Sequence, residues 1–340
     1  MKYFLTGATG FIGGVLARQL RTAGHDVHAV VRSRARAIEL ADLGVQLFEG
    51  DVTQKESLRA AMVGTDGVFH VAGWYRTGVQ RADRARAYAE AEATNVAGTR
   101  NVLELMRELA VPKGVYTSTL AINSDSRGRL LDESYHFTGR HISIYDETKW
   151  RAHYEVALPA MRDGLPLVIV QPGLVYGPGD TSALRRNLVQ YLRRRLPVVP
   201  QRTAYSWAHV EDTAHSHLLA MEKGRTGESY NVNGPAHTLE EAFALAERIT
   251  GVPAPRLHIA PAVLRGAAVL TDRLERLGRL PLPETYTAEG LRVVAGVTYL
   301  GDNRKAQRDL GFNPRALEDG LRETLLLEMR LLGLRPTPSS

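Results

Sequence analysis

The chain has 340 residues, of which 44% are hydrophobic and 24% charged, and it contains no cysteine. This balance is typical of a folded globular protein, and the lack of cysteine excludes disulfides, thiol nucleophiles and cysteine metal sites. The net charge of +6 suits anionic phosphate ligands but does not by itself indicate nucleic acid. The sequence contains no apolar leader and no apolar run of about 18 residues, so we expect no membrane span and a cytoplasmic location.

The chain opens with an apolar strand, a glycine turn and a helix. Gly7 permits a tight turn after the strand, Gly10 lets the backbone approach a phosphate, and Gly13 allows close packing of the helix on the strand. The helix N-terminus offers free N–H groups to a pyrophosphate. A glycine turn that binds nothing is the alternative, but the strand before it and the helix after it favour dinucleotide binding.

A second strand, residues 26–31, ends at Arg32. In a dinucleotide-binding fold the residue at this position reads the adenosine ribose, and an arginine there favours the 2′-phosphate of NADP over the 2′-hydroxyl of NAD. Arg34 and Arg36 follow, and a solvated arginine loop is the alternative interpretation. We therefore expect NADP as the cofactor, with NAD as the second possibility.

Two further strands are expected at residues 45–48 and 67–71. Asp51, after the first of them, could accept a hydrogen bond from adenine or cap the helix that begins near Lys55. The small residues Ala72 and Gly73, after the second, would let a flat cofactor ring pass. Strands that alternate with helices in this way predict an α/β fold, a parallel sheet with both faces covered and its ligand beyond the carboxyl ends of the strands.

A long helix is expected at residues 83–109, then a strand at 113–118 and a polar loop at 123–140. The C-terminal part predicts a strand at 228–232 and a helix at 238–249 that begins with a capping box. Further on, an amphipathic stretch at 261–281 favours core or substrate-lid packing, and a membrane-surface helix is its alternative. The last residues, 335–340, are rich in proline and serine and are expected to be disordered.

The chemistry is expected in the helix that carries Y-D-E-T-K, where Tyr145 and Lys149 share one face. A lysine ammonium nearby favours the phenolate form of tyrosine, which could then exchange a proton with a carbonyl or an alcohol. The Thr119 hydroxyl could hold the same oxygen. A coincidental surface pair is the alternative, and the upstream glycine turn argues against it.

Several motifs together resemble the extended short-chain dehydrogenase/reductase superfamily, also called NAD-dependent epimerase/dehydratase: T-G-A-T-G-F-I-G, V-A-G, N-V-A-G-T-R-N, T-S-T, Y-D-E-T-K and Q-P-G-L-V-Y-G-P-G-D. Within it, V-R-S and F-H-V-A are similar to the dihydroflavonol-reductase-like branch, which includes hopanoid-associated sugar epimerases. The resemblance implies a Rossmann doubly wound parallel sheet of about seven strands and a smaller α+β substrate lobe. The expected domains are 1–175 and 176–334, and strand 204–208 and helix 211–222 could return to the first.

The resemblance also implies the site residues. Tyr145 would be the catalytic acid/base, and Lys149 would bind the nicotinamide ribose and lower the tyrosine pKa. Thr119 falls on the catalytic Ser/Thr position, and Asn95 matches a supporting asparagine that a buried structural hydrogen bond would explain equally well. No metal ligand is implied. The expected cofactor contacts are Gly7, Thr9, Gly10, Phe11, Ile12, Gly13, Arg32, Asp51, Val52, Val71, Ala72, Gly73, Tyr145, Lys149, Pro172, Gly173, Leu174 and Val175.

One departure from the family pattern concerns the substrate. Nucleotide-sugar epimerases usually carry an arginine four residues before the H-V-x-D motif, but Tyr205 stands there in this chain, and Arg202 is out of register. A basic run at 185–195 could replace the lost charge, although a solvated helix face is its more common role. His209 and Asp212 are assigned mainly to structure, with Asp212 as the cap of the helix at 213–221.

The leading hypothesis is an NADP-dependent oxidoreductase that acts on a small-molecule carbonyl or alcohol. A sugar or nucleotide-sugar epimerase is second, and a dehydratase is the least favoured enzyme because T-S-T-L offers no acidic pair. A non-catalytic dinucleotide sensor or RNA-binding scaffold is a third class, which the intact Thr119, Tyr145 and Lys149 argue against. We expect no nucleic-acid partner, and a homodimer formed through the helices near 88–109 and 145–162.

Overall fold

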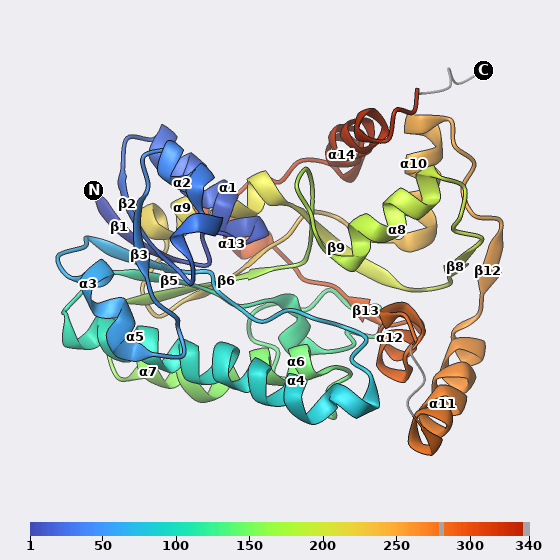
Figure 1. Cartoon of the computed structure of the whole chain (residues 1–340), viewed down its shortest axis with the longest axis horizontal. Helices are drawn as coiled ribbons and strands as arrows, with labels where there is room; N and C mark the ends of the chain where they lie inside the picture. Colours follow the sequence, from blue (N-terminus) through green and yellow to red (C-terminus); the bar gives the residue numbers. More distant parts are fainter. Residues whose placement is uncertain (279–281, 336–340) are drawn as a thin grey trace.

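A seven-stranded parallel sheet forms the centre of the larger part of the molecule (Figure 1). The computed structural model describes residues 1–278 and 282–335. The central strands are short apolar runs that are buried on both faces, as parallel strands covered by helices must be. The strand order is β10–β6–β5–β4–β1–β2–β3, and the strands are β1 (Lys2–Thr6), β2 (Asp26–Val31), β3 (Gln46–Glu49), β4 (Gly67–His70), β5 (Gly114–Thr117), β6 (Leu167–Pro172) and β10 (Ser229–Val232).

Helices cover both faces of this sheet and bury one apolar cluster on each. On one face α1 (Phe11–Thr22) packs against α9 (Val210–Lys223), with the short α2 (Ile38–Asp42) and α13 (Arg304–Leu310) beside them. The predicted doubly wound parallel sheet is therefore confirmed. Helix α9 packs on β5 and β6 of the large sheet beside α1, whereas strand 204–208 belongs to a second, smaller sheet.

The other face carries two long helical segments, each of which contains a π-helical turn. One runs through α4 (Arg84–Ala91), Glu92–Ala97 and α5 (Gly98–Glu108), and the other through α6 (Ile144–Arg151), Ala152–Ala157 and α7 (Leu158–Arg162). The short α3 (Arg59–Met62) lies nearer the sheet edge. The long helix predicted at 83–109 is thus continuous but changes its winding at Asn95.

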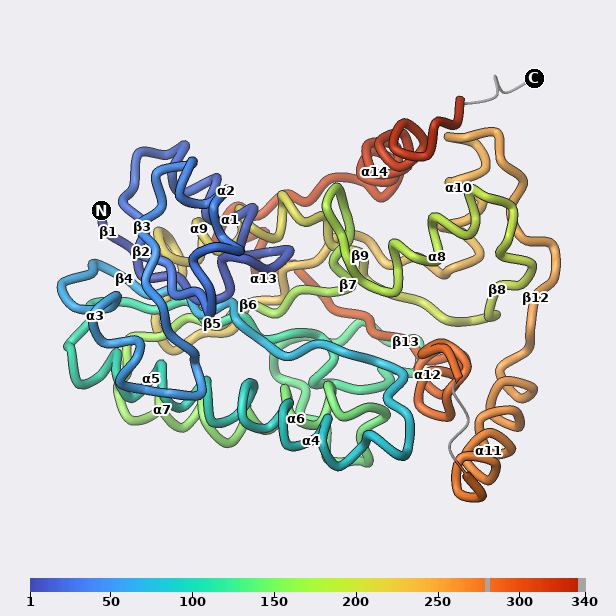
Figure 2. The backbone as a smooth tube through the Cα atoms, in the orientation of Figure 1, coloured from blue at the N-terminus to red at the C-terminus, as the bar shows by residue number. Residues whose placement is uncertain are grey.

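A smaller α+β lobe lies beyond the carboxyl ends of the central strands, at the right in Figure 2. Its larger sheet joins strands from distant parts of the chain, and three of its helices enclose a separate apolar cluster. The strands are β7 (Leu174–Tyr176), β8 (Val198–Pro200), β9 (Ala204–His209), β11 (Ala236–Thr238), β12 (Leu257–Ile259) and β13 (Thr298–Tyr299). The helices are α8 (Ala183–Leu192), α10 (Leu239–Thr250), α11 (Pro261–Leu277), α12 (Ala288–Val293) and α14 (Leu317–Leu331).

Two predictions for the C-terminal part need correction. Of the stretch at 261–281, residues Pro261–Leu277 form α11. Among its apolar residues Leu264 is buried, but Val263, Leu270 and Leu274 are exposed, so most of the apolar face is not packed in the core. Residues 279–281 of this stretch, and 336–340 of the predicted disordered tail, lie outside the described residues. The capping box predicted at Thr238 and Glu241 is confirmed.

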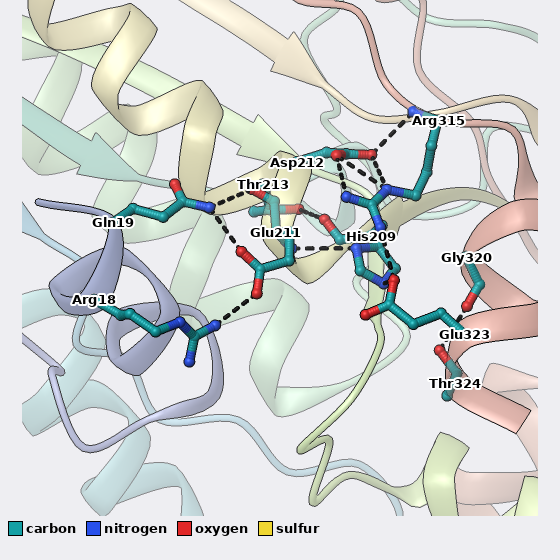
Figure 3. A network of polar contacts seen from close by, with 10 residues as sticks. All are labelled: Arg18, Gln19, His209, Glu211, Asp212, Thr213, Arg315, Gly320, Glu323 and Thr324. Carbon is teal, nitrogen blue, oxygen red and sulfur yellow. Dashed lines mark hydrogen bonds and ion pairs between the residues drawn. The ribbon is translucent and has the colours of Figure 1, made fainter. Parts of the chain in front are cut away.

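The prediction that Asp212 caps a helix at 213–221 is wrong. The helix begins at Val210, and His209 is its N-cap. The Asp212 carboxylate instead pairs with Arg315, which precedes α14, at 2.9 Å. In the same network Glu211 pairs with Arg18 of α1 at 2.6 Å, so this segment ties α1, α9 and the C-terminal segment together (Figure 3). The structural role expected for His209 and Asp212 fits these contacts.

Candidate active site

The glycine turn lies against the carboxyl end of β4. Gly7 has a φ of 76°, which a residue with a side chain rarely adopts. The Thr6 hydroxyl accepts hydrogen bonds from the N–H groups of Val71 and Ala72, each at 3.2 Å. A Cβ at Gly13 would overlap the carbonyl oxygen of Gly7. Each of these contacts draws the start of α1 against the sheet edge, as a dinucleotide-binding turn requires.

The first turn of α1 suits an anionic group. Its N-cap is Gly10, which supplies no side-chain cap, and no acidic residue lies in the first turn. The N–H groups of Phe11, Ile12 and Gly13 are therefore free of a side-chain acceptor at the positive end of a 12-residue helix. Thr9 is exposed beside this turn. The turn fits the pyrophosphate of a dinucleotide, since a carboxylate there would repel it.

The adenosine end of the expected cofactor site lies at the ends of β2 and β3. Arg32 is exposed directly after β2 and makes no ion pair within residues 1–278 and 282–335. The carboxylate of Glu49 lies opposite Val31 and accepts weakly, at 3.5 Å, from the N–H of Arg34. Asp51 accepts from the N–H and hydroxyl of Thr53. It caps no helix, because the next helical turn, Lys55–Leu58, has Gln54 as its N-cap.

The remaining predicted cofactor residues occupy the same edge of the sheet. Val52 is buried, and its carbonyl accepts from the Asn101 side chain at 2.8 Å. A Cβ at Gly173, between β6 and β7, would overlap the Ser206 carbonyl oxygen. Residues 71–73 follow β4, and residues 172–175 run from the end of β6 into β7, with β5 between β4 and β6. The fold therefore brings the predicted positions to the carboxyl ends of β1, β2, β3, β4 and β6.

Tyr145 and Thr119 lie together at the centre of this edge. Burial raises the pKa of the Tyr145 phenol well above its usual range, and a hydrogen bond with Thr119 opposes the shift. Thr119 itself is buried and caps the turn that follows β5. The shift is opposite to the one predicted from Lys149, because burial outweighs the other causes. A phenol with a raised pKa is protonated at neutral pH and can therefore donate a proton.

Lys149 is buried under the tyrosine of the preceding strand. Its ammonium donates to the Tyr116 hydroxyl at 3.0 Å and to the Thr117 carbonyl at 2.7 Å, and lies 4.6 Å from the Tyr116 ring centre. Burial lowers the pKa of Lys149 to about 7. Sequence reasoning missed Tyr116. Its position directly before the T-S-T motif, residues 117–119, could have indicated that it lies near the site. The lysine is thus fixed near the site by β5 as well as by its own helix.

Asn95 is buried at the π-helical turn. Its side-chain oxygen accepts from the Trp74 N–H at 2.7 Å, and its amide donates to the Trp74 carbonyl and to the Thr148 hydroxyl. Thr148 is the neighbour of Lys149 on α6. These contacts fix the segment after β4 to α6, so they supply the buried structural hydrogen bonds that were one of the two expected explanations for Asn95.

Three tyrosines lie near the site: Tyr75 from the segment after β4, and Tyr205 and Tyr299 from the smaller lobe. The Tyr75 ring meets the Tyr145 ring edge to face, 4.9 Å between centres. Tyr205 stacks on Tyr299 with 5.9 Å between centres, and the Tyr299 hydroxyl donates to Asp146 at 3.0 Å. Sequence reasoning missed Tyr75 and Tyr299, because only the tertiary fold brings them to the helix of Tyr145.

Two arginines of the basic run at 185–195 already pair with carboxylates of the chain. Arg185 pairs with the buried Glu328 at 2.6 Å, and Arg186 pairs with Glu284 at 2.6 Å. Glu284 also pairs with Arg76 at 3.0 Å, so one carboxylate engages two guanidinium groups. Glu328 therefore neutralises Arg185, whereas Arg186 shares one carboxylate with Arg76. The arginines at 193–195 make no ion pair among the described residues, so a role of the run in replacing the lost charge stays a prediction.

Asp146, the neighbour of Tyr145, makes stability depend on pH. Its carboxylate accepts from Ser143 at 2.7 Å and from Tyr299, and burial raises its pKa to about 7. In an unfolded chain an aspartate titrates near 3.9. The folded state therefore binds this proton more tightly, and the contribution to the free energy of unfolding is lost as the pH rises through about 7.

We expect Asp146→Asn to remove this dependence. Between about pH 5 and about pH 8 the free energy of unfolding of the wild type should fall by roughly 2–3 kcal/mol more than that of the variant. Urea unfolding at both pH values measures the difference. Parallel pH profiles for the two proteins would contradict the raised pKa.

Comparison with known proteins places these features in a family. The model of the NAD dependent epimerase/dehydratase family matches residues 3–233. A Synechocystis sp. protein whose name assigns it to the dihydroflavonol 4-reductases is 32% identical, over 95% of this chain and 93% of its own. Sterol demethylase protein B of Methylococcus capsulatus is 30% identical, over 92% and 94%.

Two further matches extend the comparison. A Stigmatella aurantiaca 4-hydroxy-2-methyl-3-oxo-4-farnesyl-3,4-dihydroquinoline-1-oxide ketoreductase is 32% identical, over 93% of this chain and 92% of its own. The crystal structure of gox2253 superposes with a TM-score of 0.82 at 29% identity and covers 98% of this chain and 99% of its own. The match therefore extends over the smaller lobe as well as the dinucleotide-binding part.

Proposed function

This chain belongs to the NAD dependent epimerase/dehydratase family, and we propose that it is an NADP-dependent oxidoreductase that interconverts a carbonyl and an alcohol on an apolar small molecule. Family membership makes it an enzyme of the reductase, dehydrogenase or epimerase type. The proposal adds that the cofactor is NADP, that Tyr145 is the acid/base and that the substrate is apolar. A homodimer and a cytoplasmic location remain predictions.

The residues of the site suit reduction. The turn at Gly7, Gly10 and Gly13 would hold the pyrophosphate, and a bound nicotinamide would supply the hydride. Tyr145 would donate its proton to the substrate oxygen, because a phenol is protonated at neutral pH and burial raises its pKa further. The Thr119 hydroxyl would hold the same oxygen, and Lys149 would hold the nicotinamide ribose while Tyr116 and Thr117 fix its position.

The observation that carries the substrate class is the aromatic cluster near Tyr145, which consists of Tyr75, Tyr205 and Tyr299. Tyr205, at the position of the expected diphosphate-binding arginine, stacks on Tyr299. Two candidates for a replacement cation, Arg185 and Arg186, are paired with carboxylates. Tyrosine rings offer large apolar contact area to a ring or chain and no charge to a diphosphate. The sterol and farnesyl-quinoline compounds in the names of two relatives are apolar, which supports the same class.

An epimerase acting on a sugar is the second candidate, because the family contains epimerases. The two functions are distinguished by the fate of the cofactor. We expect purified protein to consume NADPH stoichiometrically with hydrophobic ketones, measured at the nicotinamide absorbance band, and to leave UDP-sugars unchanged. Conversion of a sugar between epimers without NADPH consumption would contradict the reductase proposal.

The cofactor preference is expected to depend on Arg32. An ionic hydrogen bond of this kind is worth about 1.5–3 kcal/mol, so Arg32→Asp should weaken NADPH binding by roughly 10- to 100-fold and leave NADH binding unchanged or stronger. Arg36→Asp, with the same charge change four residues on, is the matched control and should lose far less. Fluorescence titration with both cofactors measures this. Equal affinity of the wild type for NADPH and NADH would refute the assignment.

A further inference from the structure

Helix α11 has an apolar stripe that faces away from the protein. Val263, Leu270, Leu274 and Leu277 are 62%, 59%, 43% and 86% exposed. Their spacing of seven, four and three residues places them along one side of the helix. The opposite side packs on α12 through buried Leu264 and Ala268. Figure 1 shows α11 at the periphery of the smaller lobe, far from the seven-stranded sheet. The helix is held to the protein by one side and presents leucines on the other.

The acidic residues of α11 lie toward the protein, and its basic residues are exposed. Glu275 turns toward the protein, where it accepts from the N–H groups of Arg81 and Ala288. Asp272 is also partly buried and faces Arg81. The basic residues Arg265, Arg273 and Arg276 are exposed. Arg276 pairs with Asp272 at 2.7 Å and Arg265 donates to the Ala295 carbonyl, whereas Arg273 makes no ion pair among the described residues. The outer surface of the helix is therefore apolar along its centre and basic along one side.

This combination fits an anionic lipid surface better than a second copy of the chain. Acidic lipid headgroups complement the exposed arginines, whereas a second copy of α11 would present the same arginines and, among its acidic residues, only the partly buried Asp272 and Glu275. A helix of 17 residues is about 25 Å long, and no helix in the described ranges is long and apolar enough to cross a membrane. We propose that α11 docks in the plane of an anionic membrane surface, with its leucine stripe among the acyl chains.

Helix α11 is also connected to the candidate active site. Its Glu275 binds the N–H of Arg81, and Glu289 of the adjoining α12 accepts from the N–H groups of Gly78 and Val79. The same segment carries Tyr75, whose ring contacts Tyr145. Docking through α11 would place this segment near the bilayer, where an apolar substrate partitions. This link to the substrate rests on the proposed function, whereas the docking itself does not.

Vesicle co-sedimentation of the full chain tests the proposal. The wild type should sediment with vesicles of phosphatidylcholine and phosphatidylglycerol, less with phosphatidylcholine alone, and less as salt rises. Leu270→Glu/Leu274→Glu should reduce the partition coefficient tenfold or more, because two leucines leave the lipid. Leu331→Glu, an equally exposed leucine on α14, is the matched control and should bind as the wild type does. Circular dichroism checks that each variant is folded.

Failure of the wild type to sediment with anionic vesicles, or equal sedimentation of the α11 variant and the control, would overturn the proposal. A dimer in size-exclusion chromatography that Leu270→Glu/Leu274→Glu dissociates, without vesicle binding by the wild type, would assign the face to a second copy. Because sedimentation needs no turnover, a failed activity assay with intact vesicle binding would count against the proposed function alone.

Discussion

Replacing Tyr145 with phenylalanine should lower kcat for carbonyl reduction by about 10³-fold or more, since the substrate oxygen loses its proton donor. The ring of phenylalanine keeps the edge-to-face contact with Tyr75, so the fold and the affinity for NADPH should be unchanged. Steady-state kinetics with a hydrophobic ketone, alongside an NADPH titration, separates the two effects.

Tyr75→Phe is the matched control for this variant. It removes a hydroxyl from the same aromatic pair but leaves the phenol of Tyr145 in place, so kcat should fall less than tenfold. Similar losses in both variants would mean that the aromatic surroundings, and not the Tyr145 proton, set the rate. Full activity of Tyr145→Phe would exclude this tyrosine as the acid.

Gly13→Ala should destabilise the protein and impair cofactor binding together. The new Cβ would overlap the backbone of Gly7, and relief of such an overlap costs about 1–3 kcal/mol or more. Moving α1 outward also displaces the N–H groups proposed to hold the pyrophosphate, so NADPH affinity should fall at least tenfold. Thermal unfolding and fluorescence titration measure the two losses.

Gly14→Ala is the matched control, and its expected effect on stability is opposite to that of Gly13→Ala. A Cβ at Gly14 would lie 3.4 Å from the nearest atom, the Ala8 carbonyl oxygen, which is an ordinary contact. Alanine is the better helix former by up to about 1 kcal/mol, so Gly14→Ala should be as stable as the wild type or more stable. Wild-type stability and NADPH affinity in Gly13→Ala would contradict the close packing of α1 on the turn.

Features that arise within a few residues of sequence could be predicted. The strand at Asp26–Val31 has the predicted bounds, because an apolar run between polar ends defines a buried strand locally. The glycine turn is equally local, since strand, turn and helix follow one another without interruption. Tyr145 and Lys149 share a helix face by spacing alone. The fold class followed because alternating strands and helices allow few other arrangements.

Features that depend on distant contacts could not be predicted. The sequence suggests that the Asp212 carboxylate caps a helix, but it forms an ion pair with Arg315, which is distant in the sequence. The Tyr205–Tyr299 stack requires β9 and β13 to pair, and no local pattern encodes that pairing. The raised pKa of Tyr145 follows from burial by several elements, whereas its spacing from Lys149 suggested a lowered one.

Periodicity also leaves open which side of a helix faces the protein. The pattern at 261–281 correctly indicates an amphipathic helix, and the core was the expected partner of its leucines. In the fold, the side with Leu264 and Ala268 packs on α12, and the side with Leu270 and Leu274 is exposed. The amphipathic pattern is the same whichever side of the helix faces the protein, so only the tertiary structure decides which side is buried.

Transfer of deuterium from NADPH that carries deuterium in place of both hydrogens at the nicotinamide C4 tests the central claim most directly. With a hydrophobic ketone that is turned over, we expect one deuterium on the carbinol carbon of the product and one NADP formed for each molecule reduced, observed by mass spectrometry and absorbance. A product that carries no deuterium, or a substrate that changes configuration while labelled NADPH is retained, would contradict an NADP-dependent reductase.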